Sequence, residues 1–301
     1  MNTHYEDIVD VTAIGQKNGL TVNELLQFAA RETWIPAAQD KEKVLVIGID
    51  VQNDFMEQGE LPVPGSHQDV SNFTKFIYNN LGKITKIAVS LDTHQPQQVF
   101  HAVWWRDVDG NAPQPFTMIT QQDIEADTWK AQFSLQSTRE YVEKLEETGK
   151  KRLMIWPYHC LQGTFGAALE GQFSNMVYFH SVVRQTEVLR IVKGLEPLSE
   201  MYGIFKAEYD PTGYINRELL NTISQYDKII IGGEAKSHCV LESVVQLAEH
   251  FALQPAMTNR IYLLEDCMSS IPGFENSTEE TFSALANQYG IHRVQSKDFK
   301  L

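Results

Sequence analysis

Short apolar runs recur along most of the chain, and polar or turn-forming residues follow each of them. Between these runs lie longer segments in which apolar residues recur at helical spacing. Such an alternation of strands and helices predicts an α/β fold with a doubly wound, mostly parallel sheet and helices on both faces. We expect strands at 44–50, 84–91, 152–156, 176–180, 187–192, 226–232, 260–265 and 291–294.

The first 43 residues differ from the rest because they contain no apolar run typical of a strand. Thr21 and Glu24 have the spacing of a capping box, which predicts a helix that Pro36 should end. We therefore expect a helical extension at 1–43 and a single α/β domain at 44–301.

An irregular stretch at 103–151 interrupts the alternation. Tryptophans and polar loops fill its first part, and a charged amphipathic helix is expected from 134 to 150. A stretch of this length without its own strand–helix pattern suggests an inserted lid or interface. Together with the extension, it leads us to expect a homo-oligomer. Further helices are expected at 70–81, from about 167, at 237–251 and at 276–288.

Composition excludes several function classes. With 43% hydrophobic and 21% charged residues, the 301-residue chain has the balance of an ordinary globular protein. Its net charge of -14 disfavours nucleic acid and anionic membranes as partners. The chain has neither a signal-peptide pattern nor an apolar run of membrane-spanning length. Three cysteines fit a reducing cytoplasm rather than a disulfide scaffold, so we expect a cytoplasmic protein.

One segment, 228–245, places a cysteine where a nucleophile could form. An isoleucine run ends at Gly232 and Gly233, and Ser237 is a candidate N-cap for the helix that follows. Cys239 then lies near a helix N-terminus, where backbone N–H groups and the helix dipole favour a thiolate and could hold an oxyanion. The alternative is a buried, inert cysteine, which is the commoner fate of a single thiol.

Several other chemically active side chains also follow predicted strands. In a doubly wound sheet, the carboxyl ends of the strands meet at one edge, where open α/β folds keep their sites. Each residue alone could be an ordinary surface or packing residue, but residues without a shared role would not all lie at the same edge of the sheet. This shared position favours Cys239 as the nucleophile. The residues are Asp50, Asp92, His94, His159, Lys193 and Cys239.

Part of this group suits a metal ion. Asp92 and His94 lie two residues apart at a strand end, so their side chains point the same way. Carboxylate and imidazole together suit a divalent metal such as zinc or iron. His159 can reach the same edge, and His101 is a further candidate seven residues after His94.

Five motifs, in order from residue 44 to about 270, resemble those of the isochorismatase-like cysteine hydrolases and, among them, the nicotinamidases. The first 43 residues and much of 103–151 lie outside the resemblance. The matching segments are DVQNDF at 50–55, DTH at 92–94, WPYHC at 156–160 with GT and GA at 163–167, KG at 193–194, and GEAKSHCV at 233–240.

The resemblance implies an amidohydrolase with a catalytic triad. Asp50 would take the thiol proton of Cys239 and later protonate the departing ammonia, while Lys193 would keep Asp50 ionised. The thiolate would attack a small, nicotinamide-like carboxamide and form a thioester that water hydrolyses. Backbone N–H groups of Ala235 and Cys239 would form the oxyanion hole, with a cis peptide bond between Glu234 and Ala235.

The resemblance also implies a metal beside the triad. Asp92, His94 and His159 would bind zinc, with iron or manganese as alternatives, and the metal would bind the ring nitrogen. Phe55 and Trp156 match the aromatic residues that sandwich the ring. Some relatives carry another histidine shortly after the DTH position, and His101 lies one or two residues beyond that register.

The chain departs from the family pattern around its cysteine. Lys236 and Ser237 replace the usual Thr-Asp pair, Glu234 replaces an apolar residue, and Thr93 occupies a position that is often aromatic. These changes leave the substrate open. One alternative is metal-independent hydrolysis of a carbamoyl or ureido compound, which the two metal histidines disfavour. Vinyl ether hydrolysis, without a cysteine, and an inactive binding or scaffold protein are the others.

Overall fold

A six-stranded sheet forms the centre of the protein in this computed structural model, which describes residues 2–147 and 151–301. Its strand order is β10-β9-β8-β1-β2-β7, and every neighbouring pair is parallel. The prediction of a doubly wound parallel sheet is therefore confirmed. The strands are β1 (Val44–Ile49), β2 (Lys86–Asp92), β7 (Leu189–Lys193), β8 (Lys228–Gly233), β9 (Ile261–Leu264) and β10 (His292–Val294).

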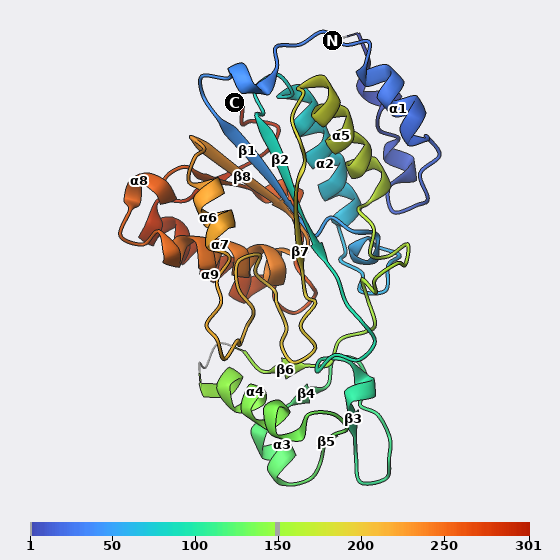
Figure 1. Ribbon diagram of the computed structural model, residues 1–301, viewed down its shortest axis with the longest axis vertical. Helices are drawn as coiled ribbons and strands as arrows, with labels where there is room; N and C mark the ends of the chain where they lie inside the picture. The colour runs from blue at the N-terminus through green and yellow to red at the C-terminus, as the bar shows by residue number, and fades with distance from the viewer. Residues whose placement is uncertain (1, 148–150) are drawn as a thin grey trace.

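Helices cover both faces of the sheet, as Figure 1 shows. One group, α1 (Val22–Ala29), α2 (Ser66–Asn79) and α5 (Gly171–Val183), covers one face. The opposite group is α6 (Arg217–Ile223), α7 (Leu241–His250), α8 (Pro255–Thr258) and α9 (Glu275–Tyr289). Within the described residues, the helices lack the combination of length and apolar character that crossing a membrane requires.

Strand β1 shows why the sheet needs both layers. All six of its residues are buried, as in a strand covered on both faces. Val44 and Val46 belong to the apolar cluster under the first helix group, while Leu45 and Ile47 belong to the cluster under the second. The period of two along the strand thus divides its side chains between two cores.

The predicted N-terminal helix is confirmed as α1. Thr21 Oγ1 accepts a hydrogen bond from the backbone N–H of Glu24, and the Glu24 carboxylate accepts one from Thr21 N. This reciprocal capping box satisfies two donors that a helix start leaves unpaired. Leu25 and Ala29 are buried, and α1 lies beside α5 (Figure 1).

Two predicted strands are wrong. Residues 176–180 are part of α5, which begins at Gly171 rather than near 167; Glu170 accepts the first-turn N–H of Phe173. This helix is buried around most of its surface, so its apolar run has no clear helical period and resembles a buried strand. The expected strand at 152–156 is reduced to β6 (Leu153–Met154), which lies outside the central sheet.

The described part of the stretch at 103–151 lies beyond the carboxyl ends of the central strands (Figure 1). It contributes to two small antiparallel sheets: β3 pairs with β5 inside the stretch, and β4 pairs with β6, which lies just after it. The end of the expected helix, 148–150, lies outside the described residues. The remaining elements are β3 (Trp105–Arg106), β4 (Met118–Ile119), α3 (Gln121–Glu125), β5 (Lys130–Ala131) and α4 (Leu135–Glu147).

Candidate active site

The carboxyl ends of four neighbouring strands bring together the side chains that the sequence singled out. Asp50 directly follows β1, Asp92 ends β2, Lys193 ends β7, and Cys239 lies in the turn after β8. The register pairs Asp92 with Lys193 across the β2–β7 ladder. His159 reaches the same place from a loop after β6, instead of from a central strand as expected.

Lys193 contacts both buried carboxylates, Asp50 and Asp92, and the thiol of Cys239. Its Nζ atom lies 2.9 Å from Asp50 Oδ2 and 3.0 Å from Asp92 Oδ1. The same ammonium group donates to Met201 O at 2.9 Å and lies 3.6 Å from Cys239 Sγ. Burial would lower the pKa of Lys193, but the two carboxylates outweigh it and hold this pKa well above its usual value. The ammonium group is therefore charged and has four contacts in a buried site.

Asp50 is fixed by its backbone and by one serine. Its φ of 47° lies in the left-handed region, an uncommon conformation for a residue other than glycine. The hydroxyl of Ser90 donates to Asp50 Oδ1 at 2.5 Å and accepts from Asp50 N at 3.0 Å. Burial raises the pKa of Asp50 despite the opposing charge of Lys193. A buried carboxylate with a raised pKa is suited to accept a proton.

Cys239 lies inside a single wide helical turn, Lys236–Val240, that leads into α7. The expected N-cap at Ser237 is wrong, because this residue is already within the turn; its Oγ instead accepts the N–H of Ile271. Burial raises the pKa of the Cys239 thiol, and Asp50 and Asp92 add to this effect. The expectation of a thiolate in the resting site is therefore corrected. Burial and the two carboxylates raise the pKa of the Cys239 thiol more than the helix terminus and Lys193 lower it, so the thiol is protonated until a base takes its proton.

The turn before Cys239 contains the cis peptide bond expected between Glu234 and Ala235. Several neighbouring N–H groups are already used: Lys236 N donates to Ser269 O, and the N–H groups of His238 and Val240 donate to Ala235 O. The N–H groups of Ala235 and Cys239 remain the candidates for binding an oxyanion next to the sulfur.

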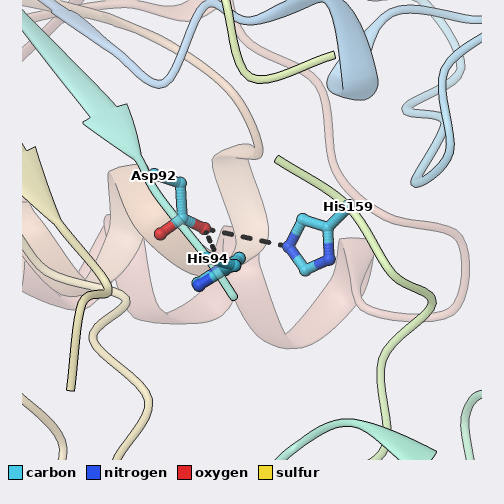
Figure 2. A group of neighbouring side chains, drawn as sticks. All are labelled: Asp92, His94 and His159. Atoms are coloured by element: carbon cyan, nitrogen blue, oxygen red, sulfur yellow. Dashed lines mark hydrogen bonds and ion pairs between the residues drawn. The ribbon is translucent and has the colours of Figure 1, made fainter. Parts of the chain in front are cut away.

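Asp92, His94 and His159 meet beside the triad, as Figure 2 shows. Their candidate ligand atoms all lie within 4.8 Å of one another, and all three side chains are buried. Asp92 Oδ2 lies 2.9 Å from His94 Nε2 and 3.8 Å from His159 Nε2 (Figure 2). Burial would raise the pKa of Asp92, but His94 and Lys193 outweigh it and lower this pKa well below its usual value. One carboxylate and two imidazoles form a donor set suited to zinc.

His101 lies next to this trio but outside the tight cluster. Its ring centroid is 6.0 Å from that of His94 and 6.4 Å from that of His159. Its Nδ1 atom contacts Pro96 O at 3.2 Å, while its buried Nε2 has no hydrogen-bond partner among the described residues. Burial and the two neighbouring histidines lower the pKa of His101 to about 3, so the ring is neutral.

A pocket opens between the thiol and the metal-ligand candidates. Phe55 and Trp156, expected from the resemblance, both line it. Trp156 makes an edge contact with His238, and Phe55 makes one with His159. Aromatic rings, histidines included, are therefore carried by half of the residues that line the pocket. Its lining residues are Phe55, Leu61, Asp92, His94, Phe100, Trp156, His159, Glu200, Met201, Tyr202, Ala235, His238, Cys239 and Ile271.

The sequence analysis missed four polar residues of the site: Ser90, Glu200, Tyr202 and His238. Ser90 carries a signal, since it is a lone hydroxyl on the same strand face as Asp92. Glu200 accepts hydrogen bonds from Trp156 Nε1 and Tyr202 OH, both at 2.5 Å. Burial raises the pKa of Glu200 to about 8. Glu200 and Tyr202 lie in an irregular loop, where no periodic pattern could have pointed to them.

The two other cysteines are buried and reduced. The backbone N–H of Cys160 donates to Asp54 Oδ2 at 2.6 Å, and burial raises the pKa of its thiol well above the usual value. The pKa of the Cys267 thiol is raised for the same reason. Both therefore pack as small apolar side chains.

Comparison with known proteins gives a consistent result. No family model matches the chain. The nicotinamidase of Saccharomyces cerevisiae is 23% identical over 217 residues, which cover 69% of this chain and 82% of that protein. The solved structure of the yeast nicotinamidase bound to the inhibitor nicotinaldehyde has a TM-score of 0.58 at 17% identity, and covers 84% of this chain and 99% of its own.

A second solved structure, the pyrazinamidase of Pyrococcus horikoshii in complex with zinc, has a TM-score of 0.50 at 20% identity. That similarity covers 84% of this chain and 98% of the pyrazinamidase chain. The matches thus span nearly the whole length of both solved structures. The resemblance seen in the motifs is confirmed at the level of the fold: the chain has the isochorismatase-like fold that these nicotinamidases and pyrazinamidases share.

Proposed function

We propose that this chain is an amidohydrolase that cleaves the C–N bond of a small aromatic carboxamide of the nicotinamide type. The observation that carries the proposal is the buried cluster in which Lys193 Nζ lies 2.9 Å from Asp50 and 3.6 Å from Cys239 Sγ. A thiol beside a carboxylate and an ammonium group has what nucleophilic attack on an amide requires. The similarity to a protein named nicotinamidase supports the substrate class.

The first step is proton transfer from Cys239 to Asp50. Asp50 has a raised pKa and is therefore a stronger base than an exposed carboxylate. The Cys239 thiol that Asp50 deprotonates lies in the same buried cluster. As the negative charge moves from Asp50 to sulfur, Lys193 stays in contact with both groups and stabilises it at either position. The thiolate attacks the carboxamide carbon, which becomes tetrahedral.

The negative oxygen that forms in this step is stabilised by the backbone N–H groups of Ala235 and Cys239. Asp50 then returns its proton to the nitrogen, and ammonia leaves. The thioester on Cys239 is hydrolysed by a water molecule, for which Asp50 acts again as the base. The products are ammonia and the aromatic carboxylic acid.

An aromatic ring is the substrate body that fits the pocket. Phe55 and Trp156 present ring faces or edges to a planar ligand, and the neighbouring Phe100 and Ile271 add apolar surface. Such walls exclude water, which strengthens the electrostatic interactions between the reacting groups.

We also propose that Asp92, His94 and His159 hold a divalent cation, with zinc first and iron or manganese as alternatives. The fit rests on three buried donors whose ligand atoms lie within 4.8 Å of one another. When bound, the cation would supply a Lewis acid for the ring nitrogen of the substrate. His101, with a neutral ring and a buried Nε2 that lacks a partner among the described residues, is a candidate for further support of this site.

The decisive experiment measures ammonia release from nicotinamide by the purified protein and its Cys239→Ala variant. We expect turnover by the parent and a loss of roughly 10⁴-fold or more in the variant, as for removal of other covalent nucleophiles. Cys267→Ala, which removes a buried thiol on another segment, serves as the control and should keep its activity. An inactive parent protein would refute the proposal, and turnover of ureido compounds alone would favour the carbamoyl alternative.

Metal analysis of the same protein tests the cation. We expect about one zinc, iron or manganese per chain, lost in His94→Ala and kept in His250→Ala, which changes an exposed histidine outside the site. Chelation should abolish turnover, and zinc should restore it. A parent protein that turns over nicotinamide without bound metal would contradict this part of the proposal.

Two further proposals concern the state of the protein in the cell. We propose a homo-oligomer in the cytoplasm, supported by the three free cysteines, by the N-terminal helix on one side of the core and by the stretch at 103–147 beyond the strand ends (Figure 1). Sedimentation at micromolar concentration should give a mass above that of one chain. A single monomeric species would count against self-association.

A further inference from the structure

Two carboxyl groups meet in the protein interior behind the turn that leads to Cys239. Glu234 is the residue before Ala235, and Asp69 lies in the first part of α2. Both side chains are buried, and each affects the pKa of the other, as neighbouring carboxyl groups do. Glu234 occupies a position where the resemblance predicts an apolar residue, so the pair is a feature of this chain that the motifs do not explain.

The two carboxyl groups cannot both be ionised in this arrangement. Ser269 N donates to Glu234 Oε2 at 3.3 Å, and the Ser269 side chain lowers the pKa of Asp69. Asp69 Oδ2 and Glu234 Oε1 are buried and receive no N–H or O–H donor from the described residues. An ionised carboxylate is only an acceptor, so a hydrogen bond between the two side chains would require one carboxyl proton. A single shared proton would satisfy both oxygens.

The charges around the pair determine which residue keeps the proton. Asp69 lies near the N-terminus of α2, whose dipole favours its ionised form, and Lys236 acts in the same direction. Asp266 opposes ionisation of Asp69, and the buried thiol of Cys267 lies beside both groups. Burial raises the pKa of Asp69 only to about 6 but raises that of Glu234 well above its usual value. At neutral pH, Glu234 therefore carries the proton.

The pair is connected to the catalytic turn on both sides of Ala235. Before Ala235, the Glu234 side chain is tied to Asp69 and to Ser269 N. After it, Lys236 N donates to Ser269 O at 2.7 Å. The position of the Ala235 N–H therefore depends on Ser269 and on the contact between Glu234 and Asp69, in addition to the hydrogen bond from Glu234 N to Ile49 O at 2.8 Å.

We propose that the proton shared by Asp69 and Glu234 positions the turn that carries the oxyanion donors Ala235 and Cys239, so that both acidic residues are positioning residues for the hydrolysis. The inference rests on the proposed function. Above the pH at which Glu234 ionises, two carboxylates face each other in the interior and repel. The turn then moves, and the transition state loses stabilisation while substrate binding changes little.

The test compares the parent with Glu234→Gln, Asp69→Asn and Glu234→Ala, using kcat and KM for nicotinamide across pH 5 to 10. Glu280→Gln, which neutralises an exposed carboxylate on α9, is the control. The amide of Glu234→Gln donates a hydrogen bond at every pH. In Glu234→Gln, we expect the pH at which kcat falls on the alkaline side to rise by at least about one pH unit. We expect the same rise in Asp69→Asn.

Glu234→Ala leaves Asp69 without its partner. We expect kcat to fall about tenfold to a hundredfold with KM within about threefold, because a small displacement of catalytic donors acts on the transition state. Glu234→Gln should restore most of this loss. Superimposable pH profiles of the parent, Glu234→Gln and Asp69→Asn, or an unchanged kcat in Glu234→Ala, would overturn the proposal.

A second measurement does not depend on activity. Because the pair has raised pKa values, the folded protein binds more protons than the unfolded chain above about pH 4. The free energy of unfolding of the parent should therefore fall with rising pH more steeply than that of Glu234→Gln. Identical slopes would refute the shared proton, whereas a parent protein that is inactive but shows the slope difference would refute only the proposed hydrolysis.

Discussion

Lys193 is the residue on which the buried charges of the site depend. It contacts the carboxylates of Asp50 and Asp92 and the thiol of Cys239, and its own side chain has no solvent exposure. A buried ion pair in water-excluded surroundings contributes little net stability when intact. Removing one partner is different, because the remaining charges then have no counter-ion.

Lys193→Met should therefore reduce both activity and stability. We expect the free energy of unfolding to fall by about 3–5 kcal/mol and turnover to become undetectable, since two buried carboxylates lose their cation. Lys228→Met is a matched control: it removes the ion pair to Glu42, which lies 2.8 Å away and is partly exposed, and should cost at most about 1 kcal/mol. Denaturant unfolding measures both variants. Equal losses of unfolding free energy in Lys193→Met and Lys228→Met would show that burial of the ion pairs does not determine the cost of removing their lysine.

How far single residues could be predicted depended on their place in the sheet. Asp50 and Lys193 lie directly at the ends of apolar runs and Cys239 lies in the turn after one, and parallel strands bring such positions together whatever the loops do. Glu200 and Tyr202 belong to a loop with no periodic pattern, so only the folded chain brings them against Trp156. Side-chain partners in loops depend on tertiary packing that local sequence does not encode.

At the scale of elements, the junction between β8 and the catalytic turn is closely packed against β1. Gly233 ends β8 with a φ of 128°, a conformation that other residues rarely adopt. A Cβ atom added there would lie 2.0 Å from the backbone oxygen of Ile49, which directly precedes Asp50. This backbone cannot move without moving the base of the site.

Gly233→Ala should consequently affect stability and activity together. We expect a loss of about 2–4 kcal/mol in the free energy of unfolding and a fall in kcat, because the strand that carries Asp50 must shift. Gly213→Ala is the control, since Gly213 also has a positive φ of 66°, but apart from its chain neighbours no atom of the described residues lies within 4 Å of the added Cβ. That variant should lose about 1–2 kcal/mol and keep its kcat. A fully active Gly233→Ala protein would contradict the argument.

The errors in predicting elements have a common physical cause. Both faces of α5 are covered, so residues 176–180 look like a buried strand although they are helical. The run at 152–156 is largely apolar, but its strand is limited to Leu153 and Met154, which pair with β4, while Trp156 makes an isolated bridge to His101. Apolar runs report burial rather than backbone geometry when an element is covered all around. Strands flanked by clear turns, such as β8, were predicted within two residues.

At the scale of the whole molecule, the stretch at 103–151 is connected to the loop that carries Glu200, one of the pocket residues. Helix α4 comes from the insertion, and its Tyr141 is fully buried. The hydroxyl oxygen of Tyr141 accepts the backbone N–H of Glu200 at 3.1 Å. Glu200 in turn accepts from Trp156 and Tyr202. One hydrogen bond thus links the insertion to the aromatic wall of the pocket.

This link predicts that the insertion influences substrate binding more than chemistry. In Tyr141→Phe, the buried N–H of Glu200 loses its acceptor, which costs about 1–3 kcal/mol. Part of this cost opposes substrate binding, because the Glu200 loop and the aromatic wall of the pocket become ordered when the ligand binds. We therefore expect KM for nicotinamide to rise about threefold to tenfold, with kcat within about twofold. Tyr214→Phe changes an exposed tyrosine and should leave both constants unchanged. A change confined to kcat would instead assign α4 a role in positioning the triad, since Lys193 also contacts this loop through Met201 O.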